Sequence, residues 1–201
     1  MPDTAVALEL TEEEALRADL YDFLGAILFR PPDQHLLDKT AALSGDESEL
    51  GQAIGALARL ARSTSPRSAE REFNALFIGV ARGELLPFAS YYLTGFLNEK
   101  PLAVLRNRMR RLGIERAENV FEPEDGIASL CEMMSGLIRG RFGSDSSLDE
   151  QKEFFNEQLR PWAGLFFKDL ESAKNSVLYA PVGTVGRLFM EIEKEAFRLA
   201  G

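Results

Sequence analysis

The stretch FEPEDGIASLCEMMSGLIRG, residues 121–140, changes from an acidic turn to an apolar helical pattern. Three carboxylates surround one proline, and apolar residues then recur at the spacing of an α-helix. Acidic residues in the first turn of a helix complement the positive end of its dipole. The stretch therefore predicts a helix start. We expect Glu122 and Asp125 to cap this helix and to present charge to a basic ligand.

Most of the remaining chain carries the same 3.6-residue period, and local signals separate the predicted helices. These start and stop signals are Thr11 with Glu14, Pro31-Pro32, Ser65-Pro66, Gly79, Gly113 and Ser147 with Glu150. No segment alternates with period two for long, so the pattern does not require strands. At 201 residues the chain has the length of one domain. We predict an all-α fold, a single-domain helical bundle over residues 1–201.

The stretch VARGELLPFASYYLTGFLNEKP, residues 80–101, interrupts the helical pattern with glycines, prolines and aromatics. We predict an irregular aromatic and proline-rich connector here. One interpretation is core packing plus a turn. The other is a peptide groove, because rigid rings supply contact area at low entropic cost. The segment VARGELLP, residues 80–87, is also a candidate hinge, so both a monomer and a domain-swapped dimer stay open.

The overall charge excludes some classes of partner. The formal net charge is −9 and the sequence pI is about 4.8. Nucleic acid and anionic lipid surfaces both require a basic footprint, which this composition lacks. No apolar run approaches the length of a membrane span, and the first residues lack the layout of a signal peptide. We expect a cytoplasmic protein, and the negative charge permits a basic partner such as a cationic peptide.

The sequence offers little for catalysis or metal binding. His35 is the single histidine, and Cys131, the single cysteine, falls on the apolar face of a predicted helix. Phosphate-binding and dinucleotide-binding glycine motifs are absent from the sequence. We predict no catalytic residue, no metal site and no cofactor. A helical hydrolase or nucleotide-processing enzyme that holds a metal with acidic clusters is a weaker alternative, because the acids lack histidine partners.

Two motifs occur in order along the chain. The first consists of Glu72, Leu76, Phe77, Gly79, Gly83, Pro87, Ser90 and Tyr92, and the second of Glu122, Pro123, Glu124 and Asp125. Together they resemble the TorD/DmsD/NarJ family of redox-enzyme maturation chaperones, and the resemblance spans roughly residues 16–197. One position departs from the family pattern, because Gly126 stands where the family has a histidine after the aspartate.

The resemblance implies a cytoplasmic, all-helical chaperone. Such proteins bind the N-terminal region or twin-arginine signal peptide of a molybdopterin oxidoreductase subunit, and hold it for cofactor insertion and assembly before export. The implied peptide-binding residues are Glu72, Phe77, Pro87, Ser90, Tyr92, Glu122, Pro123, Glu124 and Asp125. A twin-arginine leader is basic and then apolar, which an acidic turn beside an aromatic connector would complement. The alternative is a helical protein–protein adaptor without a dedicated leader-peptide groove.

Overall fold

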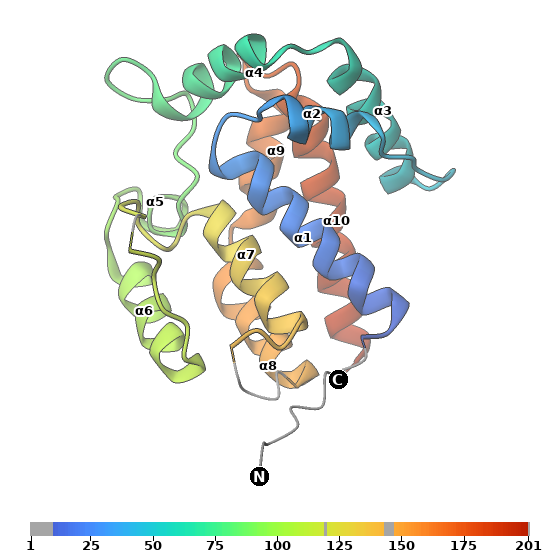
Figure 1. The fold of residues 1–201 in the computed structure, drawn as a ribbon. Helices are drawn as coiled ribbons and strands as arrows, with labels where there is room; N and C mark the ends of the chain where they lie inside the picture. Colours follow the sequence, from blue (N-terminus) through green and yellow to red (C-terminus); the bar gives the residue numbers. More distant parts are fainter. Residues whose placement is uncertain (1–9, 119, 143–146, 201) are drawn as a thin grey trace.

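The computed structural model describes residues 10–118, 120–142 and 147–200 (Figure 1). Within these ranges the chain forms ten α-helices and two short π-helical segments, without a β-strand. The predicted all-α fold is confirmed. The elements are α1 (Glu12–Phe29), α2 (Gln34–Ala41), α3 (Glu49–Ser63), α4 (Pro66–Phe73), η1 (Asn74–Ile78), α5 (Ala89–Thr94), α6 (Lys100–Leu112), α7 (Ile127–Ile138), α8 (Leu148–Phe154), η2 (Phe155–Leu159), α9 (Ala163–Ser172) and α10 (Tyr179–Leu199).

Several helices begin at the caps that the sequence predicts. At the start of α1 the Glu14 N–H donates to Thr11 Oγ1 over 3.2 Å, and the Thr11 N–H donates to Glu14 Oε2 over 2.9 Å. This reciprocal pair is a complete capping box. Ser65 caps α4, with Pro66 in its first turn, and the Ser147 hydroxyl accepts from the Glu150 N–H at the start of α8.

The main helices pack in close antiparallel and crossed pairs. In Figure 1, α1 runs beside α7, and α9 lies against α10, which also contacts α3. Glycines permit the closest approaches. A Cβ added at Gly183 of α10 would lie 2.5 Å from Glu171 N and 2.7 Å from Phe167 O, both in α9. Distances that short do not occur between real atoms of this kind, so the α9–α10 packing requires a residue without a side chain at this position.

The buried apolar side chains form one hydrophobic cluster, to which each of the ten α-helices contributes at least one residue. A buried ion pair and a tyrosine hydroxyl link α1 to α10 in this core. The Arg17 guanidinium lies 2.7 Å from Glu193 Oε1, and the Tyr21 hydroxyl donates to Glu193 Oε2 over 3.0 Å.

In the described ranges, no helix is both long and apolar enough to cross a bilayer. That residues 1–201 form a single domain stays a prediction.

The connector contains a helix that the sequence pattern did not indicate. The π-helical segment η1 ends at Gly79, whose φ of 63° lies in the left-handed region. The chain then runs irregularly to Phe88 before α5 forms over six residues. A helix this short cannot display a full apolar period, so periodicity has no means of detecting it.

Candidate functional site

The two stretches that carry the sequence motifs meet at a short backbone junction. The Ala89 N–H donates to the Asp125 carbonyl oxygen, and the Ile127 N–H donates to the Pro87 carbonyl oxygen, each over 2.9 Å. Between these two bonds, Phe88 and Gly126 form an isolated antiparallel β-bridge. The helices α5 and α7 therefore begin side by side, although α6 separates them along the chain.

The Asp125 carboxylate is buried, with 1% of the residue exposed, and it caps α5. Its Oδ2 accepts a hydrogen bond of 2.7 Å from the N–H of Ser90, the second residue of that helix. The helix α7 has Gly126 at its N-cap, no side-chain cap there and no acid in its first turn. The expectation that Glu122 and Asp125 cap α7 is therefore wrong, because the turn directs the Asp125 carboxylate toward the connector.

Glu124 is also largely buried and is held by two arginines. Its Oε2 accepts from Nε and Nη2 of Arg106 over 3.1 and 2.9 Å, and its Oε1 lies 3.8 Å from Arg116 Nη1. Burial acts to raise the pKa of Glu124, but the hydrogen bonds from Arg106 and the charges of both arginines outweigh burial and lower it. Glu124 thus ties the turn to α6 as an ionised group.

Glu72 and Phe77, two predicted site residues, lie at the start of α10. The Glu72 carboxylate accepts from the N–H groups of Val177, Leu178 and Tyr179 over 2.7, 3.1 and 2.8 Å. It thereby satisfies backbone donors that a helix N-terminus leaves free. Phe77 packs edge-to-face on Tyr179, with ring centroids 5.5 Å apart. Both side chains therefore help to hold the start of α10 in place.

Tyr92 fixes α5 against α9. Its hydroxyl donates to Asp169 Oδ2 over 2.9 Å, and its ring lies 5.3 Å from Trp162 and 6.0 Å from Phe166, measured between centroids. Burial and the neighbouring Asp169 carboxylate raise the pKa of the Tyr92 hydroxyl. The phenol therefore stays protonated and keeps donating this hydrogen bond.

Other residues of the two stretches face solvent. Glu122 is exposed, and Pro87 and Pro123 are half-buried. Large apolar side chains in the same stretches are also exposed, with 68% of Phe96 and 87% of Phe121 accessible. Exposed aromatic side chains are common in surfaces that bind other polypeptides.

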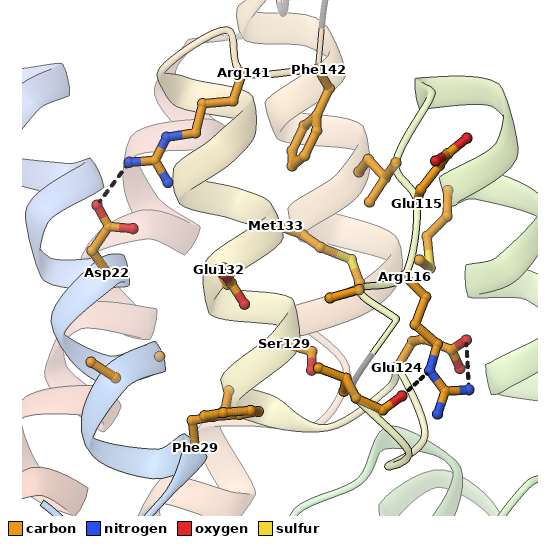
Figure 2. A pocket seen from close by; sticks show the side chains of 17 residues that line it. Asp22, Phe29, Glu115, Arg116, Glu124, Ser129, Glu132, Met133, Arg141 and Phe142 are labelled. Carbon is orange, nitrogen blue, oxygen red and sulfur yellow. Dashed lines mark hydrogen bonds and ion pairs between the residues drawn. The ribbon is translucent and has the colours of Figure 1, made fainter.

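A groove that the sequence did not predict lies beside the turn, between α1, α7 and the segment that follows α6. Figure 2 shows it, and its volume is about 530 Å³. Its lining consists of Asp22, Gly25, Ala26, Phe29, Met109, Ile114, Glu115, Arg116, Ala117, Val120, Glu124, Ala128, Ser129, Glu132, Met133, Arg141 and Phe142. Glu124 is the predicted site residue among them. The others lie on α1, α6 and α7 or in the irregular segments that follow α6 and α7, so no motif marks them in the sequence.

Cys131 and His35 offer no sign of a chemical role. Cys131 is fully buried, and burial raises the pKa of its thiol, as expected for a small apolar residue of the core. His35 lies exposed in α2. Over the described ranges, the histidine, cysteine and acidic side chains form no group of three or more that could hold a metal ion.

Comparison with known protein families matches residues 44–168, more than half of the chain, to the profile described as nitrate reductase delta subunit. The chain belongs to the nitrate reductase delta subunit family. This result confirms the resemblance to the TorD/DmsD/NarJ family that the two motifs carry. The family profile includes all nine predicted site residues, since they lie between Glu72 and Asp125.

Curated relatives of this nitrate reductase delta subunit family member bear the name chaperone protein TorD. The protein of that name from Vibrio cholerae is 26% identical over 198 residues, covering 89% of this chain and 90% of the relative. The Vibrio vulnificus protein is 28% identical over 171 residues, covering 75% and 80%. These names are those of chaperones, in agreement with the prediction of a protein that is not an enzyme.

A solved structure supports the fold. The crystal structure of a candidate redox enzyme maturation protein from Archaeoglobus fulgidus superposes with a TM-score of 0.56, covering 94% of this chain and 99% of that one. The two sequences are 21% identical, so the likeness establishes a shared helical fold.

Proposed function

We propose that this protein is a system-specific cytoplasmic chaperone of redox-enzyme maturation. It binds the N-terminal region or twin-arginine signal peptide of a molybdopterin oxidoreductase subunit. It holds that subunit for cofactor insertion and assembly before export. The observation that carries the proposal is the family match over residues 44–168, together with TorD relatives that align along about nine-tenths of both chains.

The physical character of the chain supports a basic and apolar ligand. Its net charge of −9 attracts a cationic leader over long range. At shorter range, exposed Glu122 lies next to exposed Phe121, so charge and apolar surface occur together at the turn. A leader with arginines followed by apolar residues complements both.

We propose that the nine predicted residues form the peptide-binding region in two roles. Glu122, Pro123, Pro87 and Tyr92 are at least partly accessible and contact the leader directly. The remaining five hold the backbone of this region in shape through the contacts described above: Glu72, Phe77, Ser90, Glu124 and Asp125.

The test is isothermal titration with a synthetic peptide that carries two adjacent arginines followed by an apolar stretch. We expect saturable binding that weakens as salt rises, because exposed charges are screened beyond roughly 8–10 Å at ordinary ionic strength. The control is the same peptide with both arginines replaced by glutamine, which should bind more weakly.

Two other outcomes have definite meanings. If the peptide shows no saturable binding at any salt concentration, the proposal is overturned. The alternative, an adaptor without a dedicated leader-peptide groove, is then favoured. Binding that is independent of salt would retain the chaperone function but assign recognition to apolar contacts alone.

A further inference from the structure

The groove of Figure 2 has two walls and a floor that carries both charged and apolar side chains. α1 supplies Asp22 and Phe29 on one side, and α7 supplies Glu132 and Met133 along the floor. The opposite side is the segment between α6 and α7. α1 approaches α7 closely at Gly25, where an added Cβ would lie 3.3 Å from the Ala128 carbonyl oxygen.

Carboxylates in this groove already hold guanidinium groups of the chain itself. Arg141 Nη2 lies 3.6 Å from Asp22 Oδ2 on one side, and Arg116 Nη1 lies 3.8 Å from Glu124 Oε1 on the other, both drawn in Figure 2. Glu132 lies between these two pairs in the view. It is exposed, and among the described residues none donates a hydrogen bond to it or forms an ion pair with it.

The apolar part of the groove suits side chains that follow a charge. Phe29 at the end of α1 is 44% exposed, and Met133 extends across the floor toward the opposite segment (Figure 2). At the far end, Phe142 folds back on α7, where a Cβ added at Gly136 would lie 2.4 Å from its ring. Methionine and aromatic side chains adapt to varied apolar partners.

We propose that this groove receives one arginine and the adjacent apolar side chains of the client's N-terminal segment, with Glu132 as the acceptor of the guanidinium. The inference rests on the proposed function and gives it a contact surface that the sequence motifs do not contain. Glu124 belongs to both the turn and the groove, so a bound segment can pass from one to the other without leaving the protein surface.

Charge decides which occupant the groove accepts. Lining carboxylates outnumber lining arginines, and both arginines already have carboxylate partners, which leaves Glu132 and the exposed Glu115 to attract a cation. An anionic ligand would meet uncompensated negative charge here. A cationic peptide segment gains a charge-assisted hydrogen bond, which a neutral segment would lack.

The experiment is fluorescence anisotropy with the labelled two-arginine peptide and three proteins: the wild type, Glu132→Gln and Glu70→Gln. Glu70 is an exposed acid on α4, so its variant makes the same change in net charge away from the groove. We expect Glu132→Gln to weaken binding roughly tenfold or more, as loss of a charge-assisted contact predicts. Glu70→Gln should remain close to wild type.

A double-mutant cycle localises the contact. Combining Glu132→Gln with the peptide that has glutamine for arginine should give little further loss, because each change removes the same interaction. A second groove variant, Ala26→Trp, fills the space from the exposed face of α1 and should block the peptide while the melting temperature stays near that of the wild type.

The outcomes separate this inference from the proposed function. If the wild type binds no peptide, the proposed function itself fails. If the wild type binds but Glu132→Gln and Ala26→Trp match Glu70→Gln, the leader binds elsewhere and the groove inference is overturned. A wild-type dimer in size-exclusion chromatography that Glu132→Gln dissociates would show that a second copy occupies the groove, which also overturns it.

Discussion

At the residue scale, Asp125 belongs to the motif that precedes α7 but serves a different helix. Its carboxylate accepts from the Ser90 N–H in α5, and its carbonyl oxygen accepts from the Ala89 N–H. One residue thus satisfies two backbone donors at a helix start that has no side-chain cap of its own. Asp125 is therefore expected to determine whether the connector keeps its shape.

Replacing Asp125 with alanine should lower the free energy of unfolding by about 1–3 kcal/mol, because the buried Ser90 N–H loses its acceptor. Asp125→Asn keeps an oxygen at this position and should cost less. Urea denaturation measures both changes. The matched control is Glu122→Ala, an exposed acid of the same turn, which should change stability by about 0.5 kcal/mol or less. If Asp125→Ala were as mild as this control, the cap would have no energetic importance.

At the element scale, local caps were predictable from the sequence and distant caps were not. The caps of α1 and α4 lie three residues from the groups they satisfy, so a short window contains both partners. Asp125 caps α5 across 35 positions, and Glu72 caps the start of α10 across 107. α10 begins at Tyr179, one of the three residues whose N–H groups that distant carboxylate accepts from.

The candidate site also has one part that was predictable from the sequence and one part that was not. The junction of connector and turn was foreseeable because both stretches carry motifs. The groove was not, because Phe29, Glu132 and Arg141 come together only when α1 and α7 pack. A sequence pattern within one segment cannot predict a surface that three segments form together.

The packing of α9 on α10 gives a test at this scale. Gly183→Ala should destabilise the protein by about 1–3 kcal/mol, because the new Cβ meets backbone atoms of α9 that cannot rotate away. Gly164→Ala is the matched control within α9, where an added Cβ meets nothing within 4 Å. That variant should be neutral or stabilising by up to about 1 kcal/mol.

Thermal melts of both variants measure the difference. Equal melting temperatures for Gly183→Ala and the wild type would mean that α9 and α10 separate without penalty, contrary to the close approach described above.

At the scale of the whole molecule, acidic side chains are used as structural anchors throughout. Glu171 accepts from Arg187 Nε and from the Thr184 hydroxyl, each over 2.9 Å. The hydrogen bond from Arg187 is the main cause that lowers the pKa of Glu171. Glu124 also has a lowered pKa, for the reasons given with the turn. An excess of negative charge thus coexists with carboxylates that stabilise the fold only when ionised.

Stability should therefore fall in acid. The folded pKa values of Glu124 and Glu171 lie below their ordinary value of 4.5, so the unfolded state takes up protons first as the pH falls. Their contribution is fully present above pH 4.5 and is lost as the pH falls through the folded values. Melting temperatures measured from neutral pH down to acid should decline in this window.

The control for this pH dependence is Glu171→Gln, which cannot titrate at that position. It should melt lower than the wild type at neutral pH, and the gap between the two should narrow in acid. A gap that stays constant across the window would show that Glu171 contributes nothing through its charge.

The hydrogen bonds between connector and turn close the intervening chain into one loop. The chain leaves at Pro87 and returns at Ile127, and the backbone bonds there close a loop that contains α5, α6 and one side of the groove. Opening such a loop requires the loss of its own packing, including the contacts of Tyr92 with Trp162 and Phe166, but not of the α1–α7 or α9–α10 pairs, so it should cost less than global unfolding. The side of the groove that belongs to this loop should therefore open before the side formed by α1 and α7.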